Sequence, residues 1–168
     1  MRVLRISVDG VERRPPSDVP ALLAERDAIV WVDMPHCDPE ALSLLRDVFR
    51  FHPRAIANCV ERNHMSKVHI YPEHVFTVLH APHIGQRGHV HYVELDQFVG
   101  PNFLVTVHGP VNPLVPVEVA GIDTGAVAHR LESGSLTVAH AYALSYAIAM
   151  SPGRRAAGRV AQRAREAG

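Results

Sequence analysis

Apolar residues in the first sixty positions predict alternating strands and helices. The uninterrupted run Ala28-Ile29-Val30-Trp31-Val32-Asp33 is typical of a strand that is covered on both faces. Asp38-Pro39-Glu40 predicts a helix start, because aspartate is a favoured N-cap and proline fits the first turn. Shorter patterns predict a strand over 3–7, a helix over 18–25 with Asp18 as its N-cap, and a helix over 53–60.

From Ser66 onward the apolar residues recur at every second position, which is the period of a strand. Strands are predicted over 66–71, 75–79, 89–99 and 103–107, with a loop over 82–88. Short connections join these four strands, so we expect them to form an antiparallel meander. Helices follow over 125–132 and about 136–150. The element order predicts an α+β fold, an α/β/α sandwich with a mixed, largely antiparallel sheet flanked by helices.

Length, charge and cysteine content narrow the class of protein. The chain has 168 residues, which suits one domain, and its 17 basic residues balance its 17 acidic residues. This balance argues against a nucleic-acid partner. Two cysteines, Cys37 and Cys59, are too few for a disulfide framework, and the N-terminus lacks a secretory apolar core. We therefore expect a reducing, cytoplasmic environment.

The chain divides into a body over 1–150 and a basic tail over 151–168. The tail carries five arginines against one glutamate, and Arg155, Arg159 and Arg163 recur at helical spacing. It is predicted to be a basic helix, with a solvated helical face as the plainer alternative to a nucleic-acid or membrane-surface contact. The uncharged stretch 133–153 is long enough to span a bilayer, but its serines, tyrosines and His140 favour a buried helix.

No motif in the sequence indicates an enzyme. The chain contains no glycine-rich phosphate loop, no H-E-x-x-H, no C-x-x-C and no G-x-S-x-G. A cysteine–histidine nucleophile pair is arithmetically possible, but Cys59 falls on an apolar helix face, which is typical of a buried structural thiol. We therefore expect a protein without catalytic activity.

Twelve histidines raise the question of a zinc site, because neutral imidazole is a favoured zinc ligand. His89 and His91 are two residues apart on a predicted strand and therefore share a face. His80 and His83 flank the end of the preceding strand, and His108 ends the next one. A zinc site built on His80, His83, His89 and His91 is one hypothesis. The other is that these are ordinary surface and packing histidines.

Several segments, in order and in spacing, resemble CorA-type magnesium transporters. Phe51-His52-Pro53-Arg54-Ala55-Ile56 is similar to the family's f-h-p-l-a-(v/i) helix start. Asp96-Gln97-Phe98-Val99-Gly100-Pro101-Asn102-Phe103-Leu104-Val105-Thr106-Val107-His108 resembles its hairpin q-v-s-i-(i/l)-g-x-n-f-l-v-t-v-h. Further likenesses are Trp31-Val32-Asp33, His64 to Tyr71, Val75 to His80 and Ala141 to Ile148, so the resemblance covers about 28–150.

This resemblance implies a fold, a place in the cell and partners. The family's N-terminal cytoplasmic domain is a mixed sheet between helices, followed by a long stalk helix and two transmembrane helices. The transporters are pentamers, in which magnesium bound between neighbouring cytoplasmic domains holds the pore closed. The resemblance therefore implies a domain on the cytoplasmic side of the membrane that associates with copies of itself, with the tail over 151–168 as the possible start of the stalk.

The departures from the family pattern bear on metal binding. The family's acidic pair after h-p-l-a is Ala57-Asn58 here, and the acid that closes its y-l-l-y-a-l-i-d helix aligns with Ala149. Magnesium prefers carboxylate oxygens, and Asn58 offers only a carbonyl oxygen. We therefore expect the regulatory magnesium site to be weak or absent. The sequence also contains no Gly-Met-Asn pore motif and no transmembrane pair.

Two functional hypotheses follow. The first is the cytoplasmic regulatory or structural domain of a CorA-like magnesium or other divalent-cation transporter, without the pore-forming helices. The alternative is a freestanding, soluble, histidine-rich protein that binds zinc.

Overall fold

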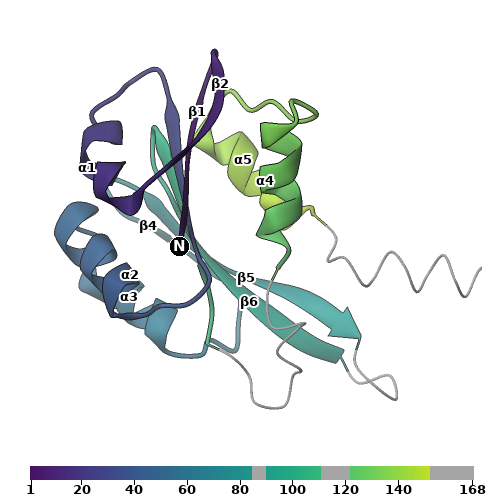
Figure 1. Cartoon of the computed structure of the whole chain (residues 1–168). Coiled ribbons are helices and arrows are strands. Elements are labelled where there is room, and N and C mark those ends of the chain that lie inside the picture. The colour runs from purple at the N-terminus through teal and green to yellow at the C-terminus, as the bar shows by residue number, and fades with distance from the viewer. Residues whose placement is uncertain (85–89, 111–121, 152–168) are drawn as a thin grey trace, which may run out of the picture.

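Seven strands form one sheet through the centre of the molecule (Figure 1). The structure is a computed structural model that describes residues 1–84, 90–110 and 122–151. The spatial order is β2-β1-β3-β7-β6-β5-β4. The strands are β1 (Arg2–Ser7), β2 (Gly10–Arg14), β3 (Ile29–Met34), β4 (Lys67–Ile70), β5 (Val75–Ile84), β6 (Val90–Val99) and β7 (Phe103–His108).

The pairing within the sheet agrees with the sequence prediction. Only β3 and β7 run parallel, and the other neighbouring strands pair antiparallel. Strands β4 to β7 form the predicted antiparallel meander. The parallel pair is possible because α2, α3 and strands β4 to β6 lie between β3 and β7 in the chain, and β6 ends at the edge of the sheet where β3 begins. The predicted α+β fold, a mixed and largely antiparallel sheet between helices, is confirmed.

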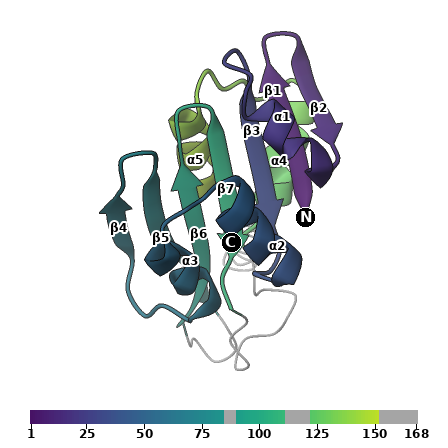
Figure 2. The ribbon, with the colours of Figure 1, turned by 90° about the vertical axis from the view of Figure 1, so that its left-hand side faces the viewer.

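Helices cover both faces of the sheet, as Figure 2 shows. One face carries α1 (Val19–Leu22), α2 (Pro39–Ser43) and α3 (Pro53–Val60), with a 3₁₀ turn η1 (Pro16–Asp18) before α1 and a π-helical turn η2 (Leu44–Val48) after α2. The opposite face carries α4 (Thr124–Glu132) and α5 (Ala141–Ala149). No helix in the described ranges is long and apolar enough to cross a membrane.

Each face of the sheet has its own hydrophobic core, because successive side chains of a strand point in opposite directions. Val30, Val32 and Met34 of β3 pack with α1–α3, whereas Ile29 and Trp31 pack with α4 and α5. Every residue of β3 is buried, as its continuous apolar run predicts. Phe76 and Phe98 are the largest side chains that fill the core beneath α3.

The helix ends were predicted with mixed success. The Asp38 carboxylate caps α2 by accepting a hydrogen bond from the Ala41 amide at 2.8 Å, as predicted. The prediction for Asp18 was wrong, because its carboxylate binds Arg14 instead and α1 has only four residues. The last helix, α5, begins at Ala141 rather than near 136. The His140 ring caps it by accepting a hydrogen bond from the Ala143 amide.

Two strand predictions were also incomplete. Strand β2 was missed because it lies at the edge of the sheet and its sequence, Gly-Val-Glu-Arg-Arg, has one apolar side chain and no alternation. Strand β5 continues to Ile84, through Pro82, where a loop was expected. Pro82 lies opposite Tyr92 of β6, so the hairpin extends past a residue that normally ends a central strand. The basic tail lies outside the described residues, apart from Ser151.

Candidate functional site

A polar cluster lies beneath the end of α3, where the chain passes from that helix into β4. We call it the α3–β4 cluster: Asn58, Asn63, Lys67, His80 and Glu94. The backbone N–H of Asn63 donates to Glu94 Oε2 at 2.9 Å, and its side-chain Nδ2 donates to Glu94 Oε1 at 2.7 Å. Nδ2 also donates to the Asn58 carbonyl oxygen at 2.8 Å. His80 Nε2 lies 3.0 Å from the Asn63 carbonyl oxygen and 3.7 Å from Glu94 Oε2.

Asn58 uses both ends of its amide inside this cluster. Its Nδ2 donates to the Arg54 carbonyl oxygen one helical turn earlier at 2.7 Å, and its Oδ1 accepts a hydrogen bond from Lys67 Nζ on β4. The only side-chain oxygen that Asn58 could offer to a cation therefore already faces an ammonium group. The carbonyl oxygen of an amide is a weaker ligand for Mg²⁺ than a carboxylate, and the neighbouring positive charge repels the ion.

A surface hollow of about 320 Å³ opens beside Asn58, between α3 and β4. Its lining contains an arginine, two histidines, a tyrosine, an asparagine and an isoleucine and no carboxylate: His52, Arg54, Asn58, His69, Ile70 and Tyr71. Hard divalent cations are held by oxygen ligands, among which one or more protein carboxylates are usual. The charged side chain in the lining of this hollow is instead the cation Arg54, which would repel a divalent cation.

Asp96 lies below the same cluster and is entirely buried. Among the described residues, neither of its carboxylate oxygens has a hydrogen-bond partner. The nearby Cys59 thiol donates to the Ala55 carbonyl oxygen at 3.5 Å. Burial, followed by the negative charge of Glu94, raises the pKa of Asp96 to about 8, although the Cys59 thiol and the Lys67 ammonium oppose that rise. Asp96 is therefore mostly a neutral acid at pH 7.

The cysteines near Asp96 are also held in their neutral form. Burial and then the charge of Asp96 raise the pKa of Cys37 to about 11 and raise the pKa of Cys59 well above its ordinary value. Metal binding and nucleophilic attack both require the thiolate. Cys59 is buried on α3, as its place on an apolar helix face predicts.

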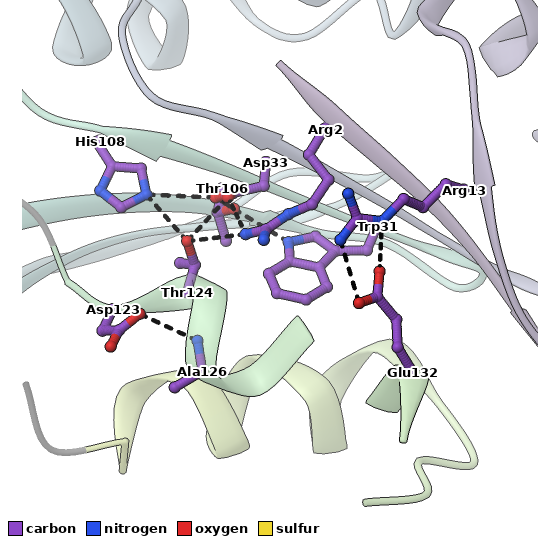
Figure 3. Close-up of polar contacts among 10 residues, drawn as sticks. All are labelled: Arg2, Arg13, Trp31, Asp33, Thr106, His108, Asp123, Thr124, Ala126 and Glu132. Carbon is purple, nitrogen blue, oxygen red and sulfur yellow. Dashed lines mark hydrogen bonds and ion pairs between the residues drawn. The ribbon is translucent and has the colours of Figure 1, made fainter. Parts of the chain in front are cut away.

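A second buried carboxylate, Asp33, lies on the opposite face of the sheet at the end of β3 (Figure 3). Arg2 Nη2 contacts Asp33 Oδ2 at 2.5 Å, and the Thr124 hydroxyl donates to the same oxygen at 2.8 Å. The Thr106 hydroxyl donates to Oδ1 at 2.6 Å, and His108 Nε2 lies 3.3 Å from Oδ1. We call these five residues the Asp33 cluster. They join β1, β3, β7 and α4.

The surroundings of Asp33 hold it in the charged form. Burial by itself would raise its pKa, but the hydrogen bond and charge of His108, followed by the Thr106 hydroxyl and the Arg2 charge, lower it to about 2. The Trp31 indole N–H donates to Thr106 at 3.1 Å and so holds the hydroxyl that binds the carboxylate. The sequence places Asp33 at the end of a strand and within the family likeness at Trp31-Val32-Asp33, without indicating its partners. The sequence feature that indicates this cluster is an aspartate at the end of an otherwise apolar run.

Comparison with known proteins places the chain in a family. The model of the CorA-like Mg²⁺ transporter protein family matches residues 26–143. The chain belongs to this family. It is 31% identical over 108 residues to the candidate metal ion transporter YfjQ of Bacillus subtilis (strain 168), covering 63% of this chain and 33% of YfjQ. The resemblance to CorA-type transporters inferred from the sequence is thus confirmed.

Solved structures share the CorA-like fold at low sequence identity. The full-length CmaX protein has a TM-score of 0.66 at 15% identity, over 88% of this chain and 43% of CmaX. The CorA magnesium transporter of Methanocaldococcus jannaschii has a TM-score of 0.56 at 11% identity, over 82% of this chain and 38% of the transporter. This chain spans a third to less than half of the length of these relatives.

Of the four histidines in the zinc hypothesis, the structure places His80 and His91 on opposite faces of the sheet. His80 lies opposite Glu94 in the β5–β6 register and shares its face of the sheet. His91 is three residues before Glu94 on β6, so its side chain points to the other face. The side chains of His83 and His89 lie outside the described residues. Within the part of the chain that is described, no three His, Cys, Asp or Glu side chains form a group that could hold a metal ion.

Proposed function

We propose that this chain is the cytoplasmic domain of a CorA-like divalent-metal transporter and has a structural and regulatory role in it. The observation that supports the proposal most strongly is the extent of the family match, from before β3 into α5, which includes elements on both faces of the sheet. Two of the three relatives named above are a candidate metal ion transporter and a magnesium transporter. On this proposal, pore-forming helices belong to a part of the transporter outside these residues.

We further propose that copies of the domain pack beside one another but are not joined by magnesium at Asn58. The contact between Asn58 Oδ1 and the Lys67 ammonium supports this, as does a neighbouring hollow lined without carboxylates. Adding or chelating Mg²⁺ should therefore leave both the oligomeric state and the melting temperature of the protein unchanged. An Mg²⁺-dependent change in sedimentation velocity, abolished by Asn58→Ala, would show that the site functions.

Fractionation of native cells tests the cellular role directly. An antibody raised against this domain is used to probe membrane and soluble fractions. The proposal expects the antigen in the membrane fraction, either as a larger band or as the 18.5 kDa chain held there by a partner. An antigen that stays in the soluble fraction at 18.5 kDa would contradict the role in a transporter.

The alternative zinc hypothesis stays a prediction that concerns His83, His89 and His91 more than His80. His83 lies opposite His91 in the hairpin register, whereas the His80 ring contacts Asn63 and Ser66. Calorimetric titration with Zn²⁺ tests it, with His91→Ala as the variant and His129→Ala on α4 as the matched control. Micromolar binding lost only in His91→Ala would support zinc as the ligand.

A further inference from the structure

The hollow between α3 and β4 has the composition of an anion site. Arg54 and His52 come from the start of α3, and His69 and Tyr71 from β4 and the residue that follows it. Arg54 is exposed, and no side chain in the described ranges forms a hydrogen bond or an ion pair with its guanidinium. A guanidinium presents several N–H donors in a plane, a geometry that suits the oxygens of phosphate.

A second cation lies directly behind the hollow. The Lys67 ammonium donates to Asn58 Oδ1, a neutral group, and within the described ranges Lys67 forms no ion pair with a carboxylate. A buried acid whose pKa the Lys67 charge lowers, Asp96, is mostly protonated at neutral pH. Glu94 is engaged by two N–H groups of Asn63. The Asn63 donors are neutral and leave the Glu94 charge in place, so Lys67 acts on the hollow mainly through its direct contact with Asn58, one of the lining residues.

The aromatic rings of the hollow limit the kind of ligand. Tyr71 stacks on His52 with ring centroids 5.0 Å apart and on His74 with centroids 4.8 Å apart. Because Tyr71 already stacks on two rings of the protein, the polar group that it offers to a ligand is its hydroxyl. Arginine and histidine N–H groups and a phenol are donors that match a compact oxyanion.

We propose that the hollow between α3 and β4 binds a phosphate group, with the Arg54 guanidinium as its principal contact and Lys67 as a supporting charge. The bound group is either free inorganic phosphate or the phosphate of a small monoester. Both sources present the same oxygens to the hollow, and they differ only in what extends beyond it. The inference is independent of the transporter role, which would stand without it.

The test is an NMR titration of the ¹⁵N-labelled protein with sodium phosphate, repeated with glycerol phosphate, at constant ionic strength. The proposal expects saturable shifts at the backbone amides of Asn58, His69 and Tyr71. Arg54→Gln should weaken binding roughly tenfold or more, because a charge-assisted hydrogen bond is lost. Arg130→Gln, which removes an exposed arginine on α4 at the opposite face of the sheet, is the matched control and should leave the affinity unchanged.

The outcomes separate the possibilities. Tighter binding of glycerol phosphate identifies a monoester as the better ligand, weaker binding identifies the free ion, and equal binding shows that the hollow recognises the phosphate group alone; all three support the site. Equal loss of affinity in Arg54→Gln and Arg130→Gln, or shifts spread evenly over the basic residues, would mean only diffuse attraction and would overturn the proposal. Because Arg54 is exposed, its substitution should not unfold the domain, and a thermal melt of each variant verifies this.

Discussion

Two buried aspartates on opposite faces of one sheet, Asp33 and Asp96, have opposite charge states at pH 7. Asp33 is 7% exposed and is met by an arginine, two hydroxyls and a histidine, whereas Asp96 is fully buried and neither of its oxygens has a hydrogen-bond partner among the described residues. The pKa of Asp33 is lowered to about 2 and that of Asp96 is raised to about 8. Burial alone thus does not decide the charge of a carboxyl group; its neighbours do.

The two aspartates lie in regions of different character. The charged groups around Asp33 are paired with one another, whereas those near Asp96 are left available to a ligand. In the Asp33 cluster each charge meets its complement, and the contacts join four elements of the fold. In the region of the α3–β4 cluster, no described residue gives Asp96 a counter-charge in hydrogen-bonding contact, and no described carboxylate lies at that distance from Lys67 or Arg54. A polar ligand gains more free energy from charged and polar groups that the protein has not already satisfied. The α3 face is therefore the better candidate for binding.

The largest expected effect is the loss of the Asp33 carboxylate. Asp33→Ala leaves Arg2 with its charge half-buried and unpaired and leaves two hydroxyls without their acceptor. Breaking a buried ion pair from one side costs about 3–5 kcal/mol of the free energy of unfolding. Urea unfolding at pH 7 measures it. A loss below about 1 kcal/mol would mean that the cluster does not hold the four elements together.

The second effect is a fall in stability as pH rises, caused by Asp96. Because its folded pKa of about 8 lies above its unfolded value of 3.8, its contribution is fully present below pH 3.8 and is lost as pH rises toward 8. Between pH 6 and pH 8 this amounts to roughly 2 kcal/mol. Asp96→Asn, which cannot ionise, should flatten that slope in urea melts at each pH. An unchanged slope would refute the assignment.

Asp33 gives the opposite dependence in acid. Its folded pKa of about 2 lies below 3.8, so its contribution is present above pH 3.8 and is lost as pH falls through 2. Thermal melts of the native protein and Asp33→Asn across this acid range should differ in slope. The Asp96→Asn variant, compared at the same pH values, should retain the acid slope of the native protein.

A smaller effect compares two threonine hydroxyls. Thr124 Oγ1 donates to the Asp33 carboxylate at 2.8 Å, so Thr124→Val should cost about 1.5 kcal/mol. Thr77 Oγ1 on β5 is buried and has no hydrogen-bond partner in the described part of the chain. Thr77→Val should therefore be neutral or slightly stabilising, because it removes an unsatisfied polar atom and keeps a β-branched side chain. Equal losses in the two variants would contradict the comparison.

The smallest effect concerns an ion pair at the surface. Arg13 of β2 contacts Glu132 of α4 at 2.6 Å, with the arginine largely exposed (Figure 3). Exposed pairs gain little because solvent screens them. Arg13→Gln should shift the melting temperature by less than the measurement resolves, both at low and at high salt. A clear, salt-dependent loss would show that this pair couples α4 to the sheet.

The sequence predicted the parts of the fold that local patterns determine. The uninterrupted apolar run gave β3 correctly, the Asp38–Pro39 pair gave the start of α2, and two-residue periodicity gave the meander. Strand β2 was missed because an edge strand with one apolar residue has no alternating pattern. Its partner strand, rather than its own sequence, fixes its conformation.

The candidate sites could be predicted only in part. The family resemblance shows that Asn58 stands where the family has an acid. The contact of Asn58 with Lys67 depends on how β4 lies against α3 and could not be predicted from the sequence. Strand alternation, read in the β5–β6 register, separates His80 from His91, and no sequence pattern gave that register. Asp33 and Asp96 both follow apolar positions on strands, and only the packed structure shows that one is surrounded by partners and the other is not.

The most direct test of the central claim is a ¹³C NMR titration of the side-chain carboxyl groups, with Asp33 and Asp96 assigned through Asp33→Asn and Asp96→Asn. Opposite charge states at pH 7 predict that the Asp33 signal changes only near pH 2 and that the Asp96 signal changes near pH 8. Titration of both groups near the ordinary aspartate pKa of about 3.9 would contradict the account.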